Sequence, residues 1–114
     1  MHKTVLMKEA VSALVTRPAG SYIDGTFGRG GHSMEILRHL SPDGSLLAVD
    51  RDPEAILFAK ILADGDPRVR VFHGLFSELP LKLRSNSKTE VDGIILDLGV
   101  KVSRVSREFD PASS

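Results

Sequence analysis

Cysteine is absent from this 114-residue sequence, which excludes disulfides, thiolate zinc sites and a cysteine nucleophile. An excess of charge of either sign is also absent, because 15 basic and 15 acidic side chains cancel. The net charge therefore does not indicate nucleic-acid binding, although a local basic face is compatible with it. The four histidines lack the spacing of metal ligands, so we expect no metal site. No long apolar run opens the chain, so we expect a cytosolic protein without a signal peptide or membrane span.

What the sequence contains is typical of one small globular domain. Its length allows a single core, and 41% hydrophobic with 26% charged residues is ordinary for a soluble protein. Apolar spacing predicts helices over residues 5–15, 31–40 and 53–63, a short helical segment over 77–83, and strands over 21–26, 45–50, 68–73 and 91–97. This alternation predicts a parallel α/β sheet with right-handed crossovers.

Two of the predicted helices carry more detailed expectations. In the helix over 31–40, the buried candidates are Met34, Ile36, Leu37 and Leu40. At the start of the helix over 53–63, Asp52 is a candidate N-cap and Pro53 suits the first helical position.

The segment YIDGTFGRGGHS, residues 22–33, is the most informative stretch. An apolar strand runs into Asp24, four glycines follow within seven positions, and an amphipathic helix begins. Glycine allows positive φ and close approach of a ligand to the main chain, and a helix start presents unpaired N–H groups. A strand, glycine loop and helix start together predict a nucleotide-like cofactor at the carboxyl end of a parallel sheet. A purely structural turn is the alternative.

Other candidate residues follow the predicted strands. Asp50 ends the second strand, where a carboxylate binds ribose hydroxyls; its alternative role is a favourable charge at a helix start. Asp24 either orients the loop through backbone N–H groups or faces a cofactor ammonium. Phe76 either flanks an adenine pocket or belongs to the core. Asp97, after the fourth strand, either contacts a reacting or cofactor amine or acts as a structural cap.

The start of the helix after the glycine loop holds three further candidates. Main-chain N–H groups at Gly30, Gly31 and His32 suit a carboxylate or phosphate, and the alternative for His32 is a capping or surface role. Two cofactors fit this geometry, a dinucleotide and S-adenosylmethionine. The carboxylate before the glycines gives a modest preference for S-adenosylmethionine.

Several blocks closely resemble the bacterial ribosomal RNA small-subunit methyltransferase H family. They are YIDGTFGRGGHS, LLAVDRDPEAI (46–56), HGLFSEL (73–79) and VDGIILDLGV (91–100), together with an N-terminal block over residues 2–9. The resemblance implies a Rossmann-like S-adenosylmethionine-dependent methyltransferase fold and methylation of the N4 amine of a cytidine in 16S ribosomal RNA. It also implies that the cofactor-contacting positions are Gly30, Gly31, His32, Asp50, Phe76 and Asp97.

The resemblance as read from these blocks ends near residue 100. The position of a family glutamine in the cofactor site falls at Arg104, which puts that contact in doubt. We therefore expect residues 1–100 to be the N-terminal part of a methyltransferase domain, with an incomplete sheet of about four parallel strands. Residues 101–114 would be a divergent polar tail, and the fourth strand, with Ile94, Ile95 and Leu96, would lie at a sheet edge.

Three functional hypotheses follow. The first is an rRNA (cytosine-N4) methyltransferase, represented by its cofactor-binding half, with Asp97 nearest the reacting amine. The second is a truncated remnant that at most binds S-adenosylmethionine and transfers no methyl group. A nicotinamide oxidoreductase is the third and least favoured.

Overall fold

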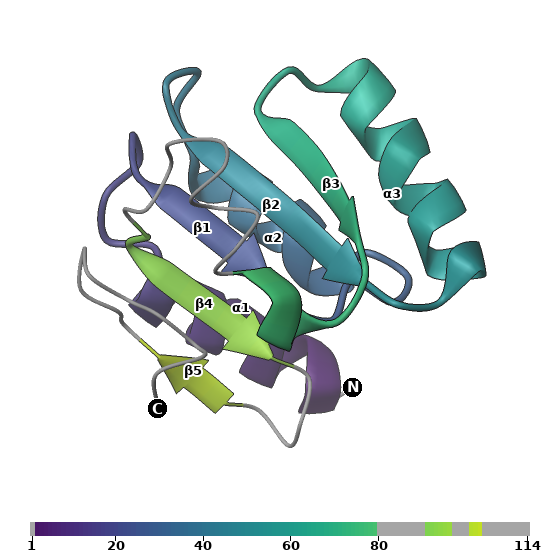
Figure 1. Ribbon diagram of the computed structural model, residues 1–114. Coiled ribbons are helices and arrows are strands. Elements are labelled where there is room, and N and C mark those ends of the chain that lie inside the picture. Colours follow the sequence, from purple (N-terminus) through teal and green to yellow (C-terminus); the bar gives the residue numbers. More distant parts are fainter. Residues whose placement is uncertain (1, 80–90, 97–100, 104–114) are drawn as a thin grey trace.

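A computed structural model describes the backbone of residues 2–79, 91–96 and 101–103, and the side chains of residues 7–79 and 91–96 (Figure 1). The elements, in chain order, are α1 (His2–Leu14), β1 (Ser21–Asp24), α2 (Gly31–His39), β2 (Ser45–Asp50), α3 (Pro53–Gly65), β3 (Val69–His73), the 3₁₀ turn η1 (Phe76–Glu78), β4 (Gly93–Leu96) and β5 (Lys101–Ser103). The predicted alternation of helices and strands is confirmed. Within the described residues, no helix combines the length and apolarity needed to cross a membrane.

The strands form one sheet in the order β3-β2-β1-β4-β5. The first four are parallel, as predicted, and β5 runs antiparallel to β4 (Figure 1). Ile94, Ile95 and Leu96 pair with residues 103, 102 and 101. The expectation that β4 lies at the sheet edge is therefore wrong, because three residues of the expected polar tail pair with it.

The register brings the carboxyl ends of the parallel strands to one edge of the sheet. Asp24 pairs with Ala48 on one side and Ile95 on the other, and Asp50 pairs with His73. Because β2 continues two residues past the level of Asp24, Asp50 projects beyond the end of β1. This carboxyl edge is the place where open α/β sheets bind ligands.

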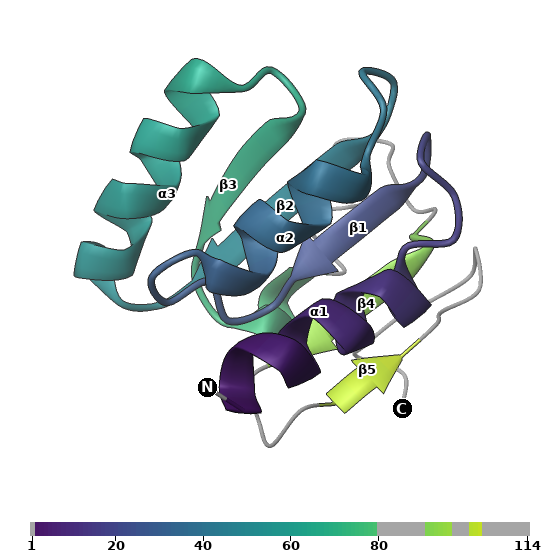
Figure 2. The same cartoon turned by 180° about the vertical axis from the view of Figure 1, so that it is seen from behind.

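The two faces of the sheet are covered differently. Side chains at even positions of β1 and β2, such as Tyr22 and Leu46, pack against α1 and α2, and Ala48 packs against Ala55 and Ala59 of α3. All three helices therefore lie on one face, since alternate residues of a strand point the same way; Figure 2 shows α1 and α2 across it. The other face buries the cluster Ile23, Val49, Leu79, Val91 and Ile94.

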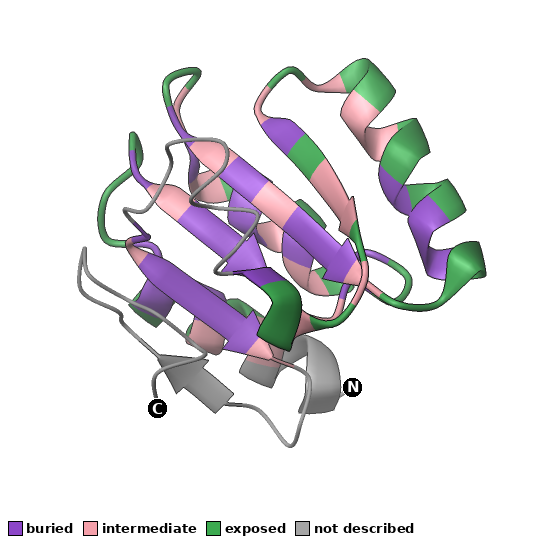
Figure 3. Cartoon of the chain, in the orientation of Figure 1, coloured by how far each residue is buried: buried purple, intermediate pink, exposed green. Residues whose placement is uncertain are grey.

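Local expectations for α2 and η1 needed correction. Met34 is 58% exposed, whereas Ile36, Leu37 and Leu40 are buried. Figure 3 shows the same kind of contrast on α3, where buried positions face the sheet and exposed positions face outward. The buried stripe follows positions 33, 36, 37 and 40, so it contains Ser33, and Met34 faces outward. Residues 77 and 78 of the helix expected over 77–83 belong to the 3₁₀ turn η1, Leu79 is α-helical, and residues 80–83 lie outside the described part.

Candidate functional site at the carboxyl edge of the sheet

Asp24 is the buried anchor of the glycine loop. Its side chain has no exposed surface, and its two oxygens accept hydrogen bonds from the Thr26 N–H at 3.2 Å and the Ser33 hydroxyl at 2.7 Å. These contacts tie the end of β1 to both ends of the loop. Of the two roles considered for Asp24, the geometry supports orientation of the loop. Ser33 was missed as a site residue, although its place one helical turn before the apolar positions 36 and 37 is a usable signal.

Glycine is required at three places in this loop, and one of them is Gly28, which has φ +58°. Gly30 has φ +88°, a left-handed conformation that side chains with a Cβ rarely adopt, and a Cβ there would lie 2.9 Å from the Phe27 ring. A Cβ on Gly25 would collide with the Leu96 side chain of β4 and would lie 3.3 Å from the Phe76 ring. The loop therefore runs close across the ends of β1 and β4.

Asp50 holds the middle of the loop. Its Oδ2 accepts the Gly28 N–H at 2.8 Å, and its Oδ1 accepts the Asp52 N–H at 3.0 Å. Both contacts are to backbone groups, and within the described residues Asp50 takes part in no ion pair. Each carboxylate oxygen can accept a second hydrogen bond, so the half-buried side chain retains acceptor capacity for a ligand.

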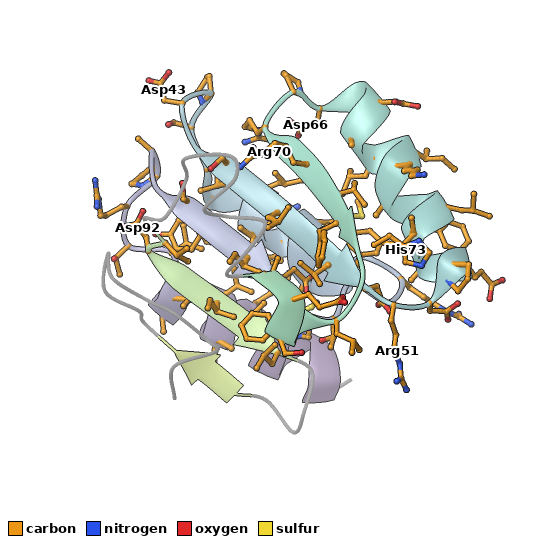
Figure 4. All side chains as sticks on the ribbon, in the orientation of Figure 1. Asp43, Arg51, Asp66, Arg70, His73 and Asp92 are labelled. Carbon is orange, nitrogen blue, oxygen red and sulfur yellow. The ribbon has the colours of Figure 1, made fainter. Side chains whose placement is uncertain are left out.

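The turn after Asp50 starts α3 as predicted. Asp52 is the N-cap, with its carboxylate accepting the Glu54 N–H at 3.0 Å, and Pro53 is the first helical residue. His73 Nε2 lies 3.1 Å from the Arg51 carbonyl oxygen, which joins the end of β3 to this turn (Figure 4). The carboxyl ends of β2 and β3 are thus tied together beside Asp50.

The remaining site candidates fall into three groups. Gly31 and His32 occupy the first turn of α2, whose N–H groups have no intrahelical acceptors, and His32 is half-buried. Phe76 is half-buried and packs against the Ile23–Val49 cluster on the second face, beside Gly25, and its two roles, in the core and beside an adenine, stay predictions. Asp97 lies outside the described residues, and its roles remain predictions.

The amino edge of the sheet holds two ion pairs that no local sequence pattern predicts. Arg68 pairs with Asp66 through two hydrogen bonds of 2.9 and 2.7 Å, and its Nη1 also donates to the carbonyl oxygens of Leu37 and Leu40 at the end of α2. The hydrogen bond from Arg68 lowers the pKa of the Asp66 carboxyl, and the same bond raises the pKa of Arg68.

The second pair joins the starts of β1 and β4. Arg17 donates to Asp92 at 2.7 Å, and the other Asp92 oxygen accepts the Ser21 N–H at 2.7 Å. Figure 4 shows Asp66 and Asp92 at the opposite edge of the sheet from Arg51 and His73. Among the residues described, no group of three His, Asp or Glu side chains could hold a metal ion.

A family model described as the MraW methylase family matches residues 1–109. The chain belongs to the MraW methylase family. The resemblance noted in the sequence is thereby confirmed, and it reaches further than residue 100, where the distinctive blocks end. A ribosomal RNA small subunit methyltransferase H from Shewanella denitrificans is 52% identical over 100 residues, covering 87% of this chain and 32% of the relative. The enzyme of the same name from Leptothrix cholodnii is 48% identical over 106 residues, covering 91% of this chain and 33% of the relative.

The chain therefore spans about a third of the length of these curated relatives. Solved structures share its fold at low sequence identity. A protein-L-isoaspartate O-methyltransferase matches with a TM-score of 0.68 at 16% identity, covering 82% of this chain and 29% of that protein. A SAM-dependent O-methyltransferase from Thermotoga maritima matches with a TM-score of 0.63 at 18% identity, covering 79% of this chain and 33% of that protein. Geranyl diphosphate methyltransferase, solved in complex with SAM, matches with a TM-score of 0.58 at 18% identity, covering 69% of this chain and 34% of that protein. The Rossmann-like methyltransferase fold is thereby confirmed.

Proposed function

We propose that this chain forms the cofactor-binding part of an S-adenosylmethionine-dependent methyltransferase that acts on the N4 amine of a cytidine in 16S ribosomal RNA. Family membership and the names of the relatives support RNA methylation. The observation that carries the proposal is the carboxyl edge itself. There, Asp24 and Asp50 hold a glycine loop in front of the first turn of α2.

The charges at this edge fit S-adenosylmethionine better than a dinucleotide. Asp50 accepts the Gly28 N–H in the middle of the loop, where its charge would repel a pyrophosphate held on the loop backbone. S-adenosylmethionine carries no phosphate and has positive sulfonium and ammonium groups. Asp50 retains acceptors for a ribose diol, and the first-turn N–H groups at Gly31 and His32 suit the methionine carboxylate.

The residues of this chain would act mainly by positioning. When bound, S-adenosylmethionine would supply an electrophilic methyl group for attack by the N4 amine. Gly30, Gly31 and His32 would hold the methionine end, and Asp50 the ribose. Phe76 would lie near the adenosine, while Asp97 would contact the cofactor and orient the amine as the catalytic candidate. Fixing the two reactants in line supplies much of the rate enhancement.

Cofactor binding is tested by calorimetry on the 114-residue chain. We expect heat of binding with S-adenosylmethionine and none with NAD under the same conditions. Binding of NAD alone would reject the proposed cofactor and the function with it. The matched control is a chain carrying Gly30→Val, which cannot adopt the φ of +88° without strain and should lose the S-adenosylmethionine signal.

Methyl transfer is tested separately with labelled S-adenosylmethionine and undermethylated small ribosomal subunits. Transfer to a single cytidine supports the full activity for this chain. Binding without transfer supports a narrower function for this chain, cofactor binding alone. Transfer to a different base would refute the cytidine assignment.

A further inference from the structure

A hollow of about 500 Å³ lies beside the glycine loop, between the loop and the start of α3. Gly28 and Arg29 line it from the loop, and Asp52, Glu54, Ala55 and Phe58 line it from the start of α3. Its volume falls within the usual range for small-molecule pockets. None of the predicted cofactor contacts lines it, but Gly28 joins it to the site, because the Gly28 N–H donates to Asp50.

Phe58 gives this hollow an aromatic wall that the core does not need. The side of α3 that packs on the sheet is formed by Ala55, Ile56 and Ala59, whereas the Phe58 side chain is 51% exposed. A half-exposed ring in a pocket offers a flat apolar face. Nucleobases of single-stranded RNA are commonly held by stacking on such faces.

The charged groups around the ring define what else an occupant must carry. Arg29 is exposed and forms no ion pair with another described residue, so it is available to an anion. The Asp52 carboxylate already accepts the Glu54 N–H, whereas no described residue donates to the Glu54 carboxylate. An occupant with an anionic group for Arg29, a flat ring for Phe58 and an amino donor for Glu54 satisfies all three. A nucleotide with an exocyclic amine has this combination.

We propose that this hollow is a nucleotide subsite for single-stranded RNA. It takes a nucleotide next to the methylated one, with its base stacked on Phe58, its amino group donating to Glu54 and its phosphate on Arg29. The inference rests on the proposed function, because an enzyme that modifies a base draws that base out of its stack and must hold the neighbouring strand. The carboxylates of Asp52 and Glu54 direct the phosphate toward the loop side of the hollow.

The binding test uses cytidine and uridine monophosphates, which differ in an exocyclic amine against a carbonyl oxygen. In an NMR titration of the 114-residue chain, we expect cytidine monophosphate to shift the backbone amides of Gly28, Arg29 and Phe58. We expect it to bind about threefold or more tightly than uridine monophosphate, because only its amine donates to Glu54. Equal binding of the two nucleotides, or shifts confined to other residues, would overturn the assignment.

Three variants divide the proposed contacts, each with a matched control. Phe58→Ala should weaken nucleotide binding about fivefold or more through lost stacking, whereas Leu57→Ala, exposed on the same helix, should not. Glu54→Gln should remove the preference for cytidine, with Asp64→Asn at the far end of α3 as control. Arg29→Ala should weaken the binding of both nucleotides equally, whereas the control Arg70→Ala, at an exposed arginine of β3, should leave their binding unchanged. An unchanged affinity in Phe58→Ala with its helical signal intact would reject the subsite.

The same titration separates this inference from the proposed function. If saturating S-adenosylmethionine leaves nucleotide binding unchanged, the hollow is a separate subsite. If the two compete, the hollow belongs to the cofactor and the inference is wrong, while the methyltransferase proposal stands. If S-adenosylmethionine fails to bind but cytidine monophosphate binds at Phe58, the cofactor proposal fails and the nucleotide pocket remains.

Discussion

The two edges of the sheet hold their carboxylates in different ways. At the amino edge, Asp66 and Asp92 are each neutralised by an arginine at 2.7 Å. At the carboxyl edge, Asp50 is held by two backbone N–H groups, and Asp24 accepts from a backbone N–H and a hydroxyl. The amino edge therefore fixes the ends of strands and helices with paired charges. At the carboxyl edge, dipoles orient Asp50 while its charge stays available to a ligand.

The largest test of this comparison is removal of the buried anchor at the carboxyl edge. Asp24→Ala would leave the Ser33 hydroxyl without its acceptor and open a gap under the loop, so we expect a loss of about 2–3 kcal/mol in the free energy of unfolding. Urea denaturation followed by circular dichroism measures it. Asp43→Ala, in an exposed turn, serves as control and should change stability by less than about 0.5 kcal/mol. An Asp24→Ala chain with unchanged stability would show that the loop does not depend on the hydrogen bonds of Asp24.

At the amino edge, the two arginines should differ. Arg68→Met removes the pairing with Asp66 and the bonds to two carbonyl oxygens at the end of α2, so we expect a loss of about 2 kcal/mol. Arg17→Met breaks a pair whose arginine is 60% exposed, and should cost less than about 1 kcal/mol. Comparison of the two urea midpoints checks the ranking. Equal losses would mean that the carbonyl contacts of Arg68 add nothing.

The smaller carboxyl-edge change compares ligand binding with folding. Asp50→Asn keeps the shape of the side chain but removes its charge and turns an amide NH₂ toward one of its two backbone N–H partners, so we expect about tenfold weaker S-adenosylmethionine binding, with a stability loss of about 1 kcal/mol. Calorimetry and urea denaturation measure the two effects. Asp52→Asn, which retains N-cap ability, is the matched control and should bind the cofactor normally. A variant at Asp50 that loses stability but keeps affinity would make this residue purely structural.

The smallest expected effect is the pH dependence of the amino-edge pair. Because the folded-state pKa of Asp66 is lowered by its hydrogen bond with Arg68, its stabilising effect is fully present above the unfolded value near 3.9. That effect is lost as the pH falls through the lower folded-state pKa. The stability difference between the natural chain and Asp66→Asn should therefore be constant above about pH 5 and shrink below pH 4. Urea denaturation across this range measures it, and a constant difference down to pH 2 would contradict the pairing.

Much of the fold follows from local sequence patterns. The strand over 45–50 and the start of the next helix at Pro53 were predicted to the residue, because an apolar run ending in Asp50 is followed at once by a capping residue and proline. Met34 was assigned to the wrong side of α2, since one apolar residue beside a buried stripe shifts the apparent face of a helix. The pairing of residues 101–103 with β4 was missed because a polar three-residue segment has no strand signal of its own.

The candidate site divides in the same way. The sequence by itself determined the glycine loop, the carboxylates that end β1 and β2, and the helix starts that follow, because turn chemistry and helix capping act between residues close in the chain. Only the tertiary structure decided that Ser33 and Gly28 satisfy those carboxylates, that Arg68 reaches the end of α2, and that Phe58 borders a hollow beside the loop. These contacts join residues up to 31 positions apart. They depend on the order and register of the strands, which no local pattern encodes.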